Sequence, residues 1–307
     1  MRGRGKTWLV MSLAGILLGG AASRGHAQAS ALPSAQAEPE VQAAGGARDG
    51  DGSGKGRKLV DEMLKALGGE AWLNRQYWNF EGRAATFYKG QPHEGAPEFQ
   101  EYYRANPFGE RIVVISHYGI FIATNHSDIA EVWTNDNGYE ITYKGTHPLP
   151  TKDVEDYQRR RKHSLDVVVK DWLKQQGVLV TYEGEGMVER HLAEKVGIVT
   201  TDNDAVTLEL DEGTHLPLSI SFQWRDPLYK DLNTDLQEFA DYHDVQGIQT
   251  AYSITTLHNG DMTGERFLTK VSYNEKLAAD LFDPIGNCRR GRSSAAGRCA
   301  VVFWASL

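Results

Sequence analysis

The sequence predicts a mainly β (α+β) protein built on one long antiparallel sheet. Two observations support this class. Residues 205–224 alternate between apolar and polar twice, around a connection at residues 212–215. Successive strand side chains point to opposite faces, so this segment predicts a hairpin with one apolar face, with Gly213 available for a positive φ. Second, no helical crossover separates the strands after residue 177, which argues against a parallel α/β sheet.

The beginning of the chain predicts export. Arg2, Arg4 and Lys6 precede an apolar run at residues 8–22, and small residues stand before Gln28. This pattern is typical of a signal peptide over residues 1–27, and the run is too short for a membrane span. No cysteine stands at the predicted cleavage site, so we expect no lipid anchor at a new N-terminus, and the short run predicts no integral membrane protein.

The rest of the chain divides into three parts. Residues 28–57 are rich in Ala, Gly, Ser, Pro and Asp and predict a disordered linker. Residues 58–284 form a single predicted domain, and residues 285–307 a disordered tail. Cys288 and Cys299, the only two cysteines, either form a disulfide there or stay free. The net charge of −8 argues against nucleic acid as a partner.

The predicted domain begins with two helices, at residues 58–67 and 70–75, separated by the helix-ending pair Gly68 and Gly69. Strands follow in close succession, and the Asn137-Gly138 pair predicts a second hairpin between residues 129–134 and 139–143. The other predicted strands span residues 77–88, 98–104, 111–116, 119–124, 178–183, 187–190, 196–201, 235–244, 248–257 and 263–273.

One long amphipathic helix is predicted in the middle of the sheet, over residues 151–176. Its apolar face carries four residues, Leu165, Val168, Val169 and Trp172. The same helix carries the basic run Arg159, Arg160, Arg161 and Lys162. These side chains either contact lipid headgroups or an acidic partner, or form a solvated face that pairs with nearby acidic residues.

Catalytic signals are missing. The sequence has no nucleophile elbow, metalloprotease motif, phosphate loop or paired-cysteine motif, and we expect neither an enzyme nor a cofactor. His243 with Asp244, and His258 with Asp261, are conceivable metal ligands. Their positions place them at opposite ends of one hairpin, so the sequence predicts no metal site. Six tryptophans after the signal peptide fill a core or line a cavity.

Four segments carry a family resemblance. ALGGEAWLNRQYWNFEGRA, TTDNDAVTLELDEGTHLPLSISFQW, LQEFADYHDVQGIQTAYSITTLHNGD and FLTKVSYNEKLAADLFDP follow one another in the order typical of one family. With them, the chain resembles the outer-membrane lipoprotein-sorting proteins of the LolA-like superfamily. The resemblance implies an unclosed, strongly curved barrel with helices as a lid on its concave apolar face, and a monomeric periplasmic carrier of lipids or lipoprotein acyl chains. Membrane partner proteins and a lid-locking arginine are also implied, with Arg83 as the candidate.

This reading predicts three groups of site residues. The lid would use the apolar face Leu165, Val168, Val169 and Trp172, and headgroups or partners would meet Arg83, Arg159, Arg160 and Arg161. An exported regulatory or protein-binding module with a filled cavity is the alternative. The predicted apolar cavity wall consists of Trp78, Phe80, Trp133, Val206, Leu208, Leu210, Leu218, Ile220, Phe222 and Trp224.

Overall fold

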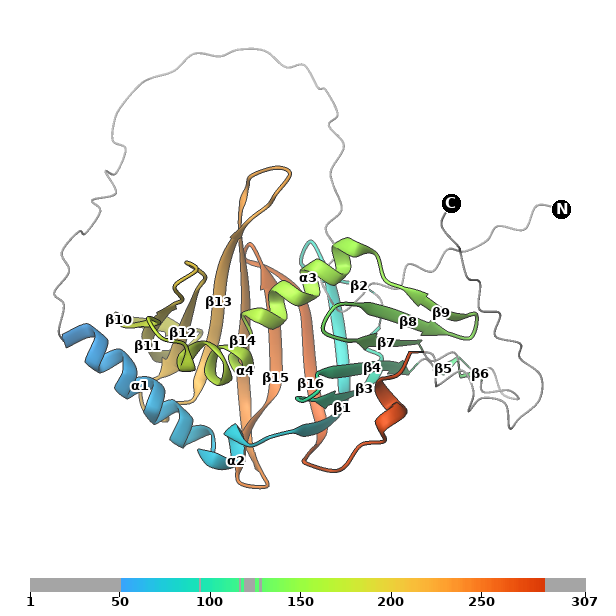
Figure 1. Cartoon of the computed structure of the whole chain (residues 1–307), viewed down its shortest axis with the longest axis horizontal. Coiled ribbons are helices and arrows are strands. Elements are labelled where there is room, and N and C mark those ends of the chain that lie inside the picture. The colour runs from blue at the N-terminus through green and yellow to red at the C-terminus, as the bar shows by residue number, and fades with distance from the viewer. Residues whose placement is uncertain (1–50, 94, 116, 119–124, 127–128, 285–307) are drawn as a thin grey trace, which may run out of the picture.

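The computed structural model describes residues 51–93, 95–115, 117–118, 125–126 and 129–284 (Figure 1). The predicted signal peptide, most of the predicted linker and the C-terminal tail with both cysteines lie outside the described residues. So does the predicted strand at residues 119–124.

A single antiparallel sheet of 14 strands forms the domain, and it is not closed, which confirms the predicted fold class. Its order is β10-β11-β12-β13-β14-β15-β16-β1-β3-β4-β7-β8-β9, with β2 paired to β1. A separate pair joins β5 (His117–Tyr118) to β6 (Asn125–His126). The sheet strands are β1 (Tyr77–Tyr88), β2 (Gln91–His93), β3 (Glu98–Arg104), β4 (Gly109–Ile115), β7 (Ile129–Trp133), β8 (Gly138–Thr142), β9 (Gly145–Pro148), β10 (Leu179–Val188), β11 (His191–Val199), β12 (Ala205–Asp211), β13 (Pro217–Arg225), β14 (Leu232–Val245), β15 (Ile248–His258) and β16 (Asp261–Tyr273).

The hairpin of β12 and β13 forms as predicted, with Leu208 opposite Ile220. Its turn is held by the Asp211 side chain, which accepts hydrogen bonds from the backbone N–H groups of Gly213 and Thr214 at 3.1 and 2.7 Å. The positive φ expected for Gly213 belongs instead to His215, at 59°. The Asp211 carboxylate stabilises the turn through these hydrogen bonds, and the turn forms without a positive φ at Gly213.

Helix α1 (Asp51–Leu67) begins seven residues before the predicted helix, so the last part of the predicted linker is helical. Its buried face comprises Leu59, Val60, Met63 and Leu67. Gly68, at φ 119°, ends the helix in a backbone conformation that residues with side chains rarely adopt. The short α2 (Glu70–Leu73) then leads into β1.

The predicted long helix is in fact broken into α3 (Thr151–Lys162), α4 (Leu165–Lys170) and the 3-10 turn η1 (Trp172–Lys174). Ser164 causes the break, because its hydroxyl accepts a hydrogen bond from the backbone N–H of Val167 and so caps α4. His163, between α3 and α4, stacks on Phe222 with ring centroids 4.1 Å apart.

These helices connect the two outermost strands, β9 and β10, so they have to cross one face of the sheet. Figure 1 shows α3 in front of the strands, with α1 alongside β10 and β11. A last 3-10 turn, η2 (Ala279–Phe282), lies against β4. Within the described part of the chain, no helix is long and apolar enough to cross a membrane.

The main core occupies only part of the covered face. Buried residues of α1, α4 and η1 pack there on β10, β11, β12, β13 and β15. Val168, Leu208 and Val196 have no exposed surface, which shows how tightly this region is filled. The face under α3 is different, because a cavity remains there.

Candidate ligand-binding cavity

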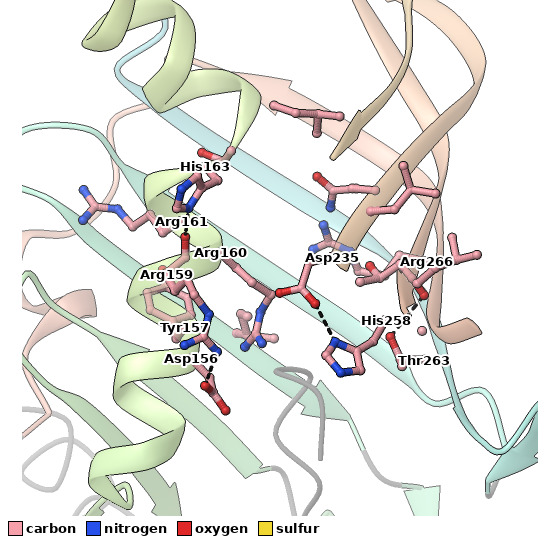
Figure 2. A pocket seen from close by; sticks show the side chains of 18 of the residues that line it. Asp156, Tyr157, Arg159, Arg160, Arg161, His163, Asp235, His258, Thr263 and Arg266 are labelled. Atoms are coloured by element: carbon pink, nitrogen blue, oxygen red, sulfur yellow. Dashed lines mark hydrogen bonds and ion pairs between the residues drawn. The ribbon is translucent and has the colours of Figure 1, made fainter. Parts of the chain in front are cut away.

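A cavity of about 340 Å³ lies between α3 and the inner face of the sheet. Its walls come from β13, β14, β15, β16, β1, β3, β4 and β7, and its cover from residues 156–166. Figure 2 shows Arg160 of α3 on the side of Asp235 and His258, with Arg159 beside Asp156 and Arg161 pointing the other way. The volume falls in the range of small-molecule sites, which run from about 300 to 1,000 Å³.

Stacked aromatic rings form much of the cavity wall. Trp78 stacks on Tyr103 with ring centroids 3.6 Å apart, and Trp133 stacks on Tyr157 of α3 at 4.0 Å. The second pair joins α3 to β7, the third strand from one edge of the sheet. Because large rings offer broad apolar surface with little rotational freedom to lose, these pairs make rigid walls.

Three consecutive arginines of α3 line the cavity, and two of them lie on aromatic rings. Arg159 lies 3.5 Å from the ring centroid of Trp224 and forms an ion pair with Asp156, and Arg161 lies 3.3 Å from that of Phe108. Burial lowers the pKa of Arg160, and the nearby carboxylate of Asp235 partly opposes that shift. Of the two alternatives for the basic run, the solvated face describes Lys162, which is exposed and pairs with Asp204, whereas the three arginines are half-buried. The pairing with a nearby acidic residue that this alternative included is present between Arg159 and Asp156.

The acidic groups of the cavity have partners of their own. Glu101 accepts from Arg266 Nη1 at 2.7 Å and from Trp78 Nε1 at 3.3 Å. On the opposite wall, Asp235 pairs with His258 Nδ1 at 2.6 Å and accepts from Trp224 Nε1 at 3.1 Å. These contacts fix the tryptophan rings in place.

Glu110 is the acidic group whose proton affinity changes most. Burial, reinforced by the charge of Glu101, raises its pKa to about 8, and the hydrogen bond from Tyr157 opposes the rise. A carboxyl group with this pKa keeps its proton at neutral pH. The cavity therefore carries less negative charge than its number of carboxyl groups suggests.

Glu110 should make the folded protein less stable as the pH rises. With its pKa raised to about 8, the folded state holds this proton up to about pH 8, whereas the unfolded chain releases it near the ordinary glutamate pKa of 4.5. Between these values the unfolding free energy falls by up to about 1.4 kcal/mol per pH unit from this group alone. We expect Glu110→Gln to remove that slope, so its stability relative to the wild type grows from pH 5 to pH 8. Urea unfolding across this range measures it, and parallel slopes for both proteins would contradict the assignment.

The predicted wall residues fall into two sets. Trp78, Trp133, Ile220, Phe222 and Trp224 line the cavity. Val206, Leu208 and Leu210 do not line the cavity and lie in the packed core, to which Trp78, Ile220 and Phe222 also belong; Phe80 packs against that core. Leu218 is half-buried and is not among the residues that line the cavity.

The predicted lid face is part of the same core. Val168, Val169 and Trp172 are buried, and Leu165 packs against them. Arg83 does not contact these helices; it is exposed and lies 3.7 Å from Glu98 on the neighbouring strand. The helix α4 is instead contacted by Arg75, whose guanidinium donates to both carboxylate oxygens of Asp166 at 3.0 and 3.1 Å.

The two histidine groups weighed as metal ligands are far apart. In the register of β14 and β15, His243 lies opposite Thr250 and His258 opposite Asp235, near the two ends of the hairpin. Among the residues that the structure describes, no group of three or more His, Cys, Asp or Glu is placed to hold a metal ion.

The cavity carboxylates were missed by the sequence reasoning, although a signal was present. Each of three adjacent strands has a glutamate two residues from an apolar residue that lines the cavity. Glu101 precedes Tyr103 on β3, Glu110 precedes Ile112 on β4, and Glu131 precedes Trp133 on β7. Residues two apart in a strand share a face. An acidic residue repeated on the apolar face of neighbouring strands therefore points to a polar cavity.

The fold and the cavity together define an open antiparallel half-barrel with a helical cover. The sequence matches no family model and no curated protein. Among solved structures, it is similar to a DUF1329 family protein from Desulfovibrio piger, with 12% identity, a TM-score of 0.49 and coverage of 76% of this chain and 98% of that one.

Two further structures belong to the group that the sequence resembles. A putative outer-membrane lipoprotein-sorting protein domain from Vibrio parahaemolyticus has 12% identity and a TM-score of 0.45, covering 75% of this chain and 97% of that one. A LolA superfamily protein from Nitrosomonas europaea has 7% identity and a TM-score of 0.42, with 74% and 96% covered.

Proposed function

We propose that this protein is a periplasmic carrier that binds the acyl chain of a lipid or lipoprotein without covalent chemistry. The observation that carries the proposal is the aromatic cavity under α3, with Trp78, Trp133, Phe222 and Trp224 in its wall. Burying about ten methylenes at ~0.8 kcal/mol each gives about 8 kcal/mol, near micromolar affinity before ordering costs. Such an affinity suits a carrier, which has to release its cargo.

The binding test uses intrinsic tryptophan fluorescence of the purified protein during titration with oleate. We expect saturable quenching, because tryptophans line the cavity, and co-purified lipid in native mass spectra. Trp224→Ala should weaken binding about tenfold, since an aromatic anchor is lost. Tyr229→Ala is the matched control: this ring is 72% exposed in the β13–β14 turn of the same hairpin. Lipid-free protein that ignores the probe would remove the proposal.

The second candidate, an exported module that binds a protein segment, has one observation in its favour. Under α1 and α4 the covered face is filled by the protein's own side chains. This candidate gains support if no acyl probe binds and a protein partner is recovered with the intact chain.

A further inference from the structure

Hydrogen-bond donors without acceptors gather around the cavity. In the described part of the chain, seven buried side-chain polar atoms lack a hydrogen-bond partner. Four of them belong to residues that line the cavity: Trp133 Nε1, Arg159 Nε, Arg160 Nη2 and Arg161 Nε. All four are N–H donors, and a buried donor without an acceptor costs free energy. A ligand that supplies acceptor oxygens would remove this cost.

Four carboxyl groups that line the cavity are engaged elsewhere. Glu101 and Asp235 already accept hydrogen bonds from other residues, and Asp156 is paired to a different nitrogen of Arg159, Nη2. Glu110 engages Tyr157, not an arginine. The unpaired N–H groups of the α3 arginines therefore remain available to a ligand, and each belongs to a positively charged guanidinium group.

We propose that Arg159 and Arg160 form an oxyanion site for the acidic headgroup of an amphipathic ligand, because Arg159 lies on Trp224 and Arg160 lies near Asp235, the carboxylate that accepts from Trp224 Nε1. The headgroup is a carboxylate or a phosphate, because planar guanidinium groups match these oxygens in geometry and charge. This inference rests on the proposed function, in which the acyl chain occupies the same cavity.

The surroundings of the arginines fit a ligand with two chemically different ends. The Arg159 guanidinium lies on the Trp224 ring, and Phe222 and Ile220 continue the apolar wall along β13. An acyl chain against β13 would place its headgroup beside α3. Apolar contact then supplies binding area, and the arginines select the charged end.

The test compares four probes at pH 7: oleate, 1-oleoyl lysophosphatidate, the uncharged methyl oleate and inorganic phosphate. Tryptophan quenching and calorimetry report binding to the wild type. We expect at least one acidic lipid to bind about tenfold or more tightly than methyl oleate. A hydrogen bond to a charged group contributes enough binding free energy for this difference. The tighter of the two identifies carboxylate or phosphate as the headgroup.

Arg160→Gln should lose this preference, because its affinity for the acidic lipids should fall about tenfold more than its affinity for methyl oleate. Arg190→Gln, in the exposed turn between β10 and β11, makes the same change in net charge and should keep the preference. If the glutamine variant does not fold, Arg160→Lys keeps the charge and loses the planar fork, and we expect a reduced preference.

The outcomes separate this inference from the proposed function. Equal binding of oleate, lysophosphatidate and methyl oleate overturns the oxyanion site and leaves the acyl-chain carrier standing. An equal loss in the Arg160 and Arg190 variants also overturns it, because net charge would then explain the preference. If no acyl probe binds, the proposed function fails; phosphate binding that Arg160→Gln abolishes would still support the oxyanion site, with a free phosphate as its ligand.

Discussion

Arg75→Met should lower the unfolding free energy by about 3 kcal/mol. The Arg75 side chain is 6% exposed, donates to both oxygens of Asp166, and lies 4.2 Å from the ring centroid of Trp72. Removing it leaves the Asp166 carboxylate partly buried with Lys170 as its remaining cation. Breaking one side of a buried pair typically costs about 3–5 kcal/mol, and Lys170 offsets part of that. Urea unfolding at pH 7 measures the loss.

Two further variants test whether the loss in Arg75→Met comes from its contact with Asp166. Arg75→Met with Asp166→Leu should recover part of the stability, because no buried charge is left without its arginine. Arg83→Met removes an exposed arginine whose partner Glu98 is 3.7 Å away, and it should change stability by less than about 0.5 kcal/mol. Similar losses for Arg75→Met and Arg83→Met would show that Arg75 does not hold the helix.

Leu208→Ala should destabilise the protein by about 2–5 kcal/mol and leave the affinity for oleate unchanged. Leu208 has no exposed surface and lies in the core, and it is not among the residues that line the cavity. Truncating a buried leucine removes apolar contacts and leaves a void, which accounts for the expected loss. Unfolding experiments and fluorescence titration of the folded variant measure the two quantities.

Trp224→Ala provides the opposite case for comparison with Leu208→Ala. The Trp224 ring is half-buried and lines the cavity, so its loss should affect oleate binding more than folding. If Leu208→Ala instead weakened binding and barely changed stability, the predicted wall at Val206, Leu208 and Leu210 would be part of the site after all.

Alternation along the chain was sufficient to predict the sheet. The period of two is a local property, and it located the hairpin of β12 and β13 correctly because one face of each strand is buried. It also showed which residues share a face. It could not show what covers that face, so Leu208 and Phe222 looked equivalent. Both belong to the packed core, but only Phe222 also lines the cavity.

The basic helix was harder to interpret, for a physical reason. A run of arginines usually faces water, and the nearby acidic residues on α3 made that arrangement plausible. The contacts that turn Arg159 and Arg161 inward come from Trp224 and Phe108, which are distant in sequence. Likewise, Arg75 and Asp166 are 91 residues apart, and no local pattern reveals such a pair.

The helical cover is tied to the sheet at both of its ends. Because β9 precedes α3 and β10 follows η1, the cover is a strap between the two outer edges and not a flap with one hinge. A strap of fixed length limits how far the edges can separate. Widening the cavity would therefore require the sheet to change its curvature or the strap to lengthen where it is already broken, at His163 and Ser164. Cargo release and bending of the sheet would then be one mechanical event.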